Sequence, residues 1–126
     1  MPQMSVVPFA AFVVYAGADG ARSFHFSPED CTAVIQGIPD SGNLDIFLPG
    51  PHDPVPPAEG DWYIVADPKG LLLPGYGHSA RTATIHGSGF HIQGEAALVL
   101  SDTYGWAAFQ FDPLNRLWIA FVGNIA

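Results

Sequence analysis

The sequence predicts an all-β protein, an antiparallel β-sandwich or jelly-roll-like barrel with one short helix at about residues 28–36. Fourteen glycines and twelve prolines separate short apolar runs along the whole chain, which is typical of strands joined by tight turns. Several of the runs alternate apolar and polar residues, as half-buried strands do. A length of 126 residues is typical of one domain, so we expect a single β domain over residues 1–126.

The expected strands follow one another from the N-terminus. The first is Val6–Ala16, with Pro8 near its start, where an edge strand tolerates a missing N–H donor. In the second, Arg22–Phe26, Phe24 and Phe26 share one face. The remaining strands before the C-terminal hairpins are expected at Leu44–Leu48, Trp62–Ala66, Leu71–Leu73 and Ala96–Leu100.

The segment 27–37, SPEDCTAVIQG, carries the signals of a short helix. Ser27 is placed to act as the N-cap, Pro28 suits the first helical position, and Gly37 follows the end. The two acidic residues of the first turn suit the positive end of the helix dipole. Thr32, Val34 and Ile35 are β-branched and fit a strand equally well, so a strand is the alternative.

The segment RTATIHGSGFHIQGE predicts a hairpin with one hydrated face. A two-residue type II′ turn at Gly87-Ser88 would pair Ile85 with Phe90. One face then holds Ala83, Ile85, Phe90 and Ile92, and the other holds Thr82, Thr84, His86, His91, Gln93 and Glu95. This register is expected because it places the apolar residues on one face of the hairpin, where they can be buried together.

The last hairpin, in WAAFQFDPLNRLWIAFVGNIA, is apolar on both faces. A loop of Pro113-Leu114-Asn115 would place Asp112 opposite Arg116 as a cross-strand ion pair. One face then carries Ala107, Phe109, Phe111, Leu117, Ile119 and Phe121, and the other carries Trp106, Ala108, Gln110, Trp118, Ala120 and Val122.

Strands 6–16 and 62–66 are also apolar on both faces. One short helix and one opposing sheet cannot cover three such segments in a domain of this size. We therefore expect another chain to cover part of this surface, since a large apolar patch on a monomer favours aggregation. The candidate interface residues are Phe12, Val14, Trp106, Trp118 and Val122.

Charge excludes several functions. Twelve acidic and four basic residues give a net charge of −8, and the scattered bases form no patch for phosphates, so we expect neither nucleic-acid nor membrane binding. The apolar N-terminal run has no base before Arg22, so it does not read as a signal peptide. We expect an intracellular origin, or a place in a virion. Cys31 is the single cysteine and fits a small buried apolar residue.

The segment Gly50–Gly60, GPHDPVPPAEG, is a proline-rich loop. Its prolines favour a stiff, extended backbone. Such a loop serves either as a rigid connection between sheets or as an arm that docks on a neighbour.

The histidines allow one metal-site hypothesis. His78, His86, His91 and Glu95 would form a ligand set that suits zinc or iron. The order PGYGH followed by HGSGFHIQGE resembles the metal-binding cupins, which are small β-barrels, although the paired His-x-His is absent and the two segments are reversed. Hydrated histidines on a strand face explain the same residues.

No hydrolase, nucleotide-binding or calcium motif is present in the sequence. We therefore predict a non-enzymatic structural protein without a cofactor, acting as a homo-oligomer or on a larger scaffold, most concretely as a virion accessory or capsid-decoration protein. The alternatives are a small binding module, either an inhibitor or immunity protein or a carbohydrate binder, and a metal-dependent cupin-like barrel.

Overall fold

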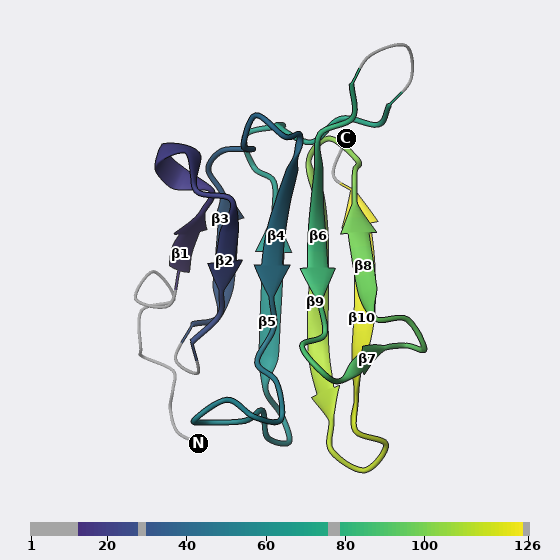
Figure 1. Ribbon diagram of the computed structural model, residues 1–126. Helices are drawn as coiled ribbons and strands as arrows, with labels where there is room; N and C mark the ends of the chain where they lie inside the picture. Colours follow the sequence, from purple (N-terminus) through teal and green to yellow (C-terminus); the bar gives the residue numbers. More distant parts are fainter. Residues whose placement is uncertain (1–12, 28–29, 76–78, 125–126) are drawn as a thin grey trace, which may run out of the picture.

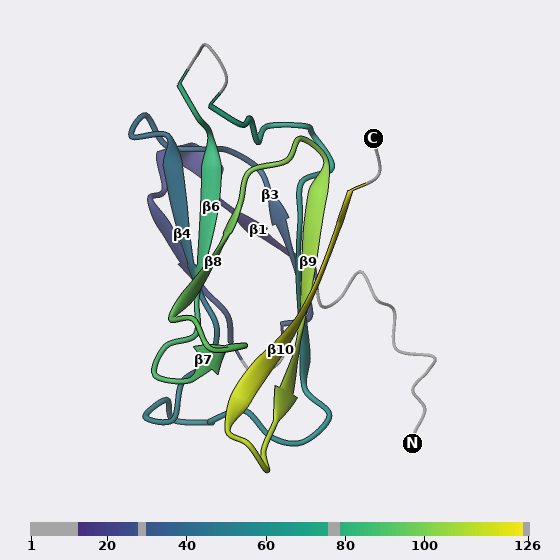
Figure 2. The same ribbon diagram turned by 90° about the vertical axis from the view of Figure 1, so that its right-hand side faces the viewer.

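The computed structural model describes residues 13–27, 30–75 and 79–124, and it shows two β-sheets packed face to face (Figures 1 and 2). The strands are β1 (Val13–Ala16), β2 (Ser23–His25), β3 (Thr32–Ile35), β4 (Asn43–Phe47), β5 (Trp62–Ala66), β6 (Thr82–His86), β7 (His91–Ile92), β8 (Ala97–Leu100), β9 (Gly105–Asp112) and β10 (Leu117–Asn124). A single 3-10 turn, Ala18–Gly20, precedes β2. The predicted all-β sandwich is confirmed.

The sheets are mixed, so the prediction of antiparallel sheets is wrong. The six-stranded sheet has the order β1-β3-β5-β9-β10-β7, and the four-stranded sheet has the order β2-β4-β6-β8. From β1 to β6 the chain crosses to the facing sheet after every strand. Each strand therefore lies parallel to the strand two places earlier, as β1, β3 and β5 do in one sheet and β2, β4 and β6 in the other.

These crossings give the sandwich two ends. The upper end in Figure 1 consists of residues 17–22, 36–42, 67–75, 79–81 and 101–104, which join strands where the chain leaves the six-stranded sheet or enters β9. The lower end includes the proline-rich loop 48–61 and the turn 113–116. The segment Gly50–Gly60 contains no strand, so the predicted loop is confirmed.

The short helix predicted at residues 28–36 is wrong. Residues 32–35 form β3, which pairs in parallel with both β1 and β5. Ala33 and Ile35 alternate into the core, so the β-branched residues were the deciding signal. The amide of Ser27 donates to the Asp30 carboxylate (2.7 Å) and the amide of Asp30 donates to the Ser27 carbonyl (3.0 Å), closing a turn before the strand. No helix among the described residues is long and apolar enough to span a membrane.

The core lies between the sheets and is built by the alternation of each strand. Its fully buried side chains include Trp118, Phe109, Ile35, Leu44, Ile46, Ile85 and Val65. Aromatic rings fill its lower half, where Trp118 meets Tyr63 and Phe111 edge-on at centroid distances of 5.7 and 5.2 Å. This shared core holds the two sheets together, so the composition of their outer faces can differ.

The predicted hairpin over residues 82–95 does not form. Its predicted apolar residues Ala83, Ile85, Phe90 and Ile92 are all buried, but its polar residues are divided between the two sheets. β6 pairs with β8, and β7 crosses to the other sheet to pair with β10. The amide of Phe90 donates to the Gly87 carbonyl (3.2 Å), so a turn is present, with Ser88 and Gly89 at its centre, one residue later than predicted. Because it carries the chain between sheets, Ile85 and Phe90 are both buried without being cross-strand partners.

The β9–β10 hairpin forms with a register one residue away from the prediction. Leu117, and not Arg116, lies opposite Asp112, and Arg116 adopts a left-handed conformation with φ of 55°. Arg116 lies over the ring of Phe90 (5.2 Å), so the expected Asp112–Arg116 pair is absent. The shift places Trp118 opposite Phe111, inside the sandwich.

Asp112 instead holds the turn together. Its carboxylate accepts hydrogen bonds from the Asn115 side chain (2.8 Å) and from the amides of Leu114 and Asn115 (3.0 and 3.2 Å). The side-chain bond from Asn115 is the main reason that the pKa of Asp112 lies below its ordinary value.

We expect Asn115→Ala to raise the pKa of Asp112 toward its ordinary value, because the largest stabilising contact of the ionised form is lost. The contribution of Asp112 to stability is present above the pKa of the unfolded chain and is lost as the pH falls through the lower folded pKa. An NMR titration of the Asp112 carboxyl carbon measures the change. An unchanged titration in the variant would contradict the role assigned to Asn115.

Candidate interaction surface

The outer face of the six-stranded sheet is almost entirely apolar. Strand register and the alternation of burial assign its side chains. We define the apolar face as the outward residues Val13, Tyr15, Thr32, Val34, Trp62, Ile64, Ala66, Trp106, Ala108, Gln110, Leu117, Ile119, Phe121 and Gly123. Thr32 and Gln110 are its polar members, and none of these residues is charged.

The apolar face covers five neighbouring strands, from the edge strand β1 to β10, and Figure 2 shows this layer in profile. Tyr15, Trp62 and Phe121 are its most exposed large side chains, at 61%, 41% and 46%. The rings of Trp62 and Phe121 stack at a centroid distance of 5.7 Å, 25° from parallel. Its lower border is marked by polar residues, Asp112 and His91.

The face has relief as well as apolar character. The indole of Trp106 lies against Gly123, where any Cβ atom would collide with the ring. Ala66 lies in the same cross-strand row at the upper border of the face, and Ala108 is buried nearer its middle. Large rings and small residues thus both contribute to this surface.

The five predicted interface residues differ in position and in burial. Trp106 lies on the apolar face and is half-buried. Val122 points to the inner side of β10 but is 55% exposed, beyond the cover of the other sheet. Val14 packs against the core and Trp118 is completely buried, so the expectation that these two contact a partner is wrong. Phe12 lies outside the described residues.

Sequence reasoning missed Tyr15, Trp62 and Phe121 as the exposed rings of this face. For Phe121 the cause is the register error of the last hairpin. For Trp62 a signal existed, since Tyr63 and Val65 alternate with it, but alternation alone does not tell which side another sheet covers.

The outer face of the four-stranded sheet is different, because polar groups pair with one another there. Asn43 Oδ1 accepts hydrogen bonds from the hydroxyls of Thr82 and Thr84, both at 2.8 Å. Asp45 Oδ1 lies 2.9 Å from His86 Nε2, and it accepts a hydrogen bond from the side-chain Nδ2 of Asn43 (3.1 Å). This face is hydrated in the ordinary manner of an exposed sheet.

A ladder of rings runs across the same face. Phe47 stacks between His25 and His86, at centroid distances of 4.4 and 4.5 Å. The parallel register of β2, β4 and β6 places the three residues in one row. The ladder explains two of the five histidines as packing residues.

The predicted metal ligands are not brought together. His86 lies in the four-stranded sheet and pairs with Asp45, while His91 lies exposed in β7 of the other sheet. Glu95 lies in the turn after β7, and His78 falls outside the described residues. Residues 13–27, 30–75 and 79–124 contain no cluster of three or more His, Cys, Asp or Glu residues able to hold a metal ion.

Comparison of the sequence with protein-family models and with curated proteins finds no match.

Proposed function

We propose that this protein is a non-enzymatic structural module that works by assembly, and that a second copy of the chain covers its apolar face. The observation that supports the proposal is the apolar face itself: its fourteen residues on β1, β3, β5, β9 and β10 include no charged side chain, and Asp112 stands only at its lower border, in a chain with a net charge of −8. Depletion of charge with enrichment of aromatic residues is the composition of interface cores.

The relief of the face favours a second copy over an unrelated partner. In a twofold dimer the same patch meets itself, so it must offer both projections and hollows. The exposed rings of Trp62 and Phe121 project from the face, and a hollow lined in part by Ala66 and Trp106 lies at its upper border. A twofold rotation can therefore set the rings of one copy against the hollow of the other.

The area of the face sets the strength of the contact. Five strands about 4.8 Å apart and about 17 Å long present roughly 400 Å² per copy, or about 800 Å² for two copies, which is below the roughly 1,200 Å² at which stable specific interfaces begin. We therefore expect a dimer that dissociates on dilution. Because the contact joins two acidic molecules through apolar residues, added salt should strengthen it by screening their repulsion.

The most concrete setting that we propose is a virion, in which the protein serves as an accessory or capsid-decoration protein. A small β-sandwich that associates weakly by itself gains strength when many copies are held on one scaffold. The low number of basic residues fits a surface component rather than one that contacts the packaged nucleic acid.

The test is the mass in solution. Light scattering of the purified chain over a range of concentrations should give more than one subunit. Phe121→Asp and Trp106→Asp should each weaken this association at least tenfold, because each would bury a charge in the contact.

Val99→Asp is the matched control. Val99 is 59% exposed and lies on the outer face of the four-stranded sheet, so the same added charge should leave the mass unchanged. A wild-type chain that stays at one subunit at every concentration and salt would overturn the proposal. Equal effects of Phe121→Asp and Val99→Asp would also overturn it.

A further inference from the structure

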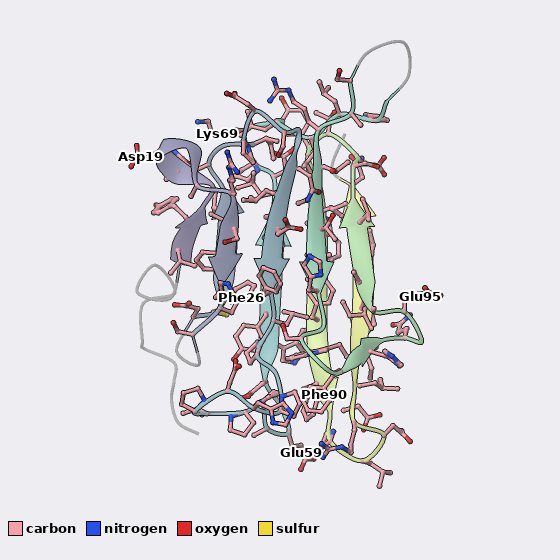
Figure 3. All side chains as sticks on the ribbon, viewed as in Figure 1. Asp19, Phe26, Glu59, Lys69, Phe90 and Glu95 are labelled. Carbon is pink, nitrogen blue, oxygen red and sulfur yellow. The ribbon has the colours of Figure 1, made fainter. Side chains whose placement is uncertain are left out.

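The edge of the six-stranded sheet next to β7 is only half covered. β7 pairs with Leu117 and Trp118, so no strand in the described part of the chain lies beside the rest of β10, residues 119–124. The turn after β7, marked by Glu95 in Figure 3, leads the chain on to β8 in the other sheet. Figure 2 looks onto this edge and shows β7 beside the lower part of β10. We call residues 119–124 the open edge.

The backbone of the open edge is placed to pair with a further strand. Just below it, the Gln93 amide donates to the Trp118 carbonyl (3.1 Å), and the Ala120 amide donates to the Gln93 side chain (2.6 Å). Alternate residues of an edge strand point their N–H and C=O groups outward, so Val122 is the next residue to do so. Charged residues or prolines usually protect such edges, and residues 119–124 include neither. An added strand can therefore bind here by β-augmentation.

The side chains along the open edge are apolar. Phe121 is 46% exposed and Val122 is 55% exposed, and the two point to opposite sides of β10. A strand that pairs with this edge covers both of them. It must therefore be free of charge, since a buried charge without a partner is costly.

The chain itself contains a segment of this kind. Residues 1–12, which lie outside the described residues, carry no charged side chain and include Val6, Val7 and Phe9. The sequence predicts a strand over residues 6–16, and β1 is the last part of that range. We call residues 1–12 the N-terminal segment.

The position of β1 favours an open edge on a second copy. Val13 and Phe121 lie in the same cross-strand row, on β1 and β10. Within one copy these strands are about 19 Å apart, so the N-terminal segment would have to cross the apolar face, where the second copy packs. If the twofold axis of the dimer runs along the strands, β1 of one copy lies opposite β10 of the other, about 10 Å away. About three extended residues span that distance, which leaves enough of the segment to pair along the open edge.

The area of the dimer gives a second reason. Two apolar faces bury about 800 Å², less than the roughly 1,200 Å² of stable specific interfaces. A sheet edge with its side chains is about 10 Å deep, so a strand paired over about 20 Å buries roughly 200 Å² on each copy. Two such contacts bring the total to about 1,600 Å², the ordinary size of a specific interface.

We infer that the N-terminal segment of each copy forms an added strand on the open edge of β10 in the second copy. This exchange rests on the proposed dimer, because the facing copy is what brings the two edges within reach. Each copy donates one strand and receives one, so the contact closes as a pair. The exchange adds backbone hydrogen bonds to an association that the apolar face alone would leave weak.

The first test changes the donated strand in the whole chain. Phe9→Asp should weaken the association at least tenfold in sedimentation equilibrium, because it would bury a charge at an apolar edge. Gln3→Asp is the matched control, since it adds the same charge outside the predicted strand. It should weaken the association less than threefold, and equal effects of the two variants would overturn the inference.

The second test changes the receiving edge. Val122→Pro removes the outward N–H group while keeping an apolar side chain, so it should weaken the association at least tenfold. Val122→Thr keeps the N–H group and a similar shape, and it should have less than a threefold effect. Circular dichroism establishes that each variant is folded. A folded Val122→Pro chain that associates like the wild-type chain would overturn the inference.

Hydrogen exchange shows which copy supplies the strand. In the wild-type chain, the Val122 amide should exchange at least tenfold more slowly at concentrations where the chain is associated than where it is dissociated. Phe9→Asp should abolish this difference. Equal protection at every concentration would place the N-terminal segment on its own copy and would overturn the inference.

Trp106→Asp separates the exchange from the dimer on which it rests. If Trp106→Asp weakens the association but Phe9→Asp and Val122→Pro do not, the dimer through the apolar face stands and the strand exchange is wrong. If Phe9→Asp and Val122→Pro weaken it but Trp106→Asp does not, the contact between the apolar faces is wrong. A wild-type chain that stays at one subunit at every concentration would overturn both.

Discussion

Trp118→Ala should lower the free energy of unfolding by about 3–5 kcal/mol, the usual cost of deleting a large buried aromatic side chain. Trp118 is completely buried and is held between the rings of Tyr63 and Phe111. Its removal leaves a cavity between the sheets that these neighbours cannot fill. In a domain of ordinary stability this is a large part of the total. Urea denaturation at equilibrium, followed by circular dichroism at one protein concentration, measures the loss.

Trp62→Ala is the matched control, because Trp62 is 41% exposed on the apolar face. It should cost less than half as much at protein concentrations where the chain is dissociated. Trp118→Phe should also cost less, since Trp118 Nε1 is buried without a hydrogen-bond partner in the described part of the chain and phenylalanine removes that donor. Equal losses for Trp118→Ala and Trp62→Ala would contradict the assigned register.

The positions of most strands could be predicted from the sequence, but their pairing and register could not. Local signals placed most strands well, and Trp62–Ala66 coincides with β5. Turn chemistry also predicted a turn at Gly87-Ser88, one residue before the observed turn at Ser88-Gly89. Local signals do not specify which strands become neighbours, however, so the predicted hairpin over 82–95 and the antiparallel sheets were both wrong. Pairing is decided by contacts far apart in sequence, such as β3 with β5.

In the last hairpin, an error of one residue in the predicted register changes which side chains lie on the outer surface. The turn preferences of Pro113 and Asn115 predicted a three-residue loop, but the structure has the four-residue turn 113–116. The shorter loop would have set Asp112 opposite Arg116, and such a pair contributes under about 1 kcal/mol when exposed. Burial of Trp118 is worth more, so the packing of the core set the register.

The same limit applies to the candidate surface. Composition was sufficient to predict that more apolar strand area exists than one domain covers, and the uncharged face of the six-stranded sheet agrees with that expectation. Composition could not tell which residues would be left outside. Val14 and Trp118 point inward, while Tyr15 and Phe121 point outward, because the side chain's direction depends on the pairing of each strand.

The second large effect concerns Asp67, a residue that no local sequence signal marks. Asp67→Ala should lower the free energy of unfolding by about 3–5 kcal/mol, because one buried and two part-buried amides would lose a charged acceptor. The Asp67 carboxylate is 1% exposed. It accepts from the amides of Leu71 (2.8 Å), Leu72 (3.0 Å) and Tyr104 (3.1 Å), and so joins the loop after β5 to the loop before β9.

Asp67→Asn separates the charge and geometry of this group from its volume. The asparagine side chain keeps one oxygen, but its NH₂ group would face amide donors at the position of the second oxygen, so an intermediate loss is expected. Hydrogen exchange should report the same order, with the amides of Leu72 and Tyr104 exchanging faster in Asp67→Asn and fastest in Asp67→Ala.

Asp102→Ala is the matched control. Asp102 lies in the same loop as Tyr104 but is exposed, so its removal should change the free energy of unfolding by less than about 0.5 kcal/mol. If Asp67→Ala were no more destabilising than Asp102→Ala, the loop after β5 and the loop before β9 would be held together by packing alone, and the role assigned to the Asp67 carboxylate would be wrong.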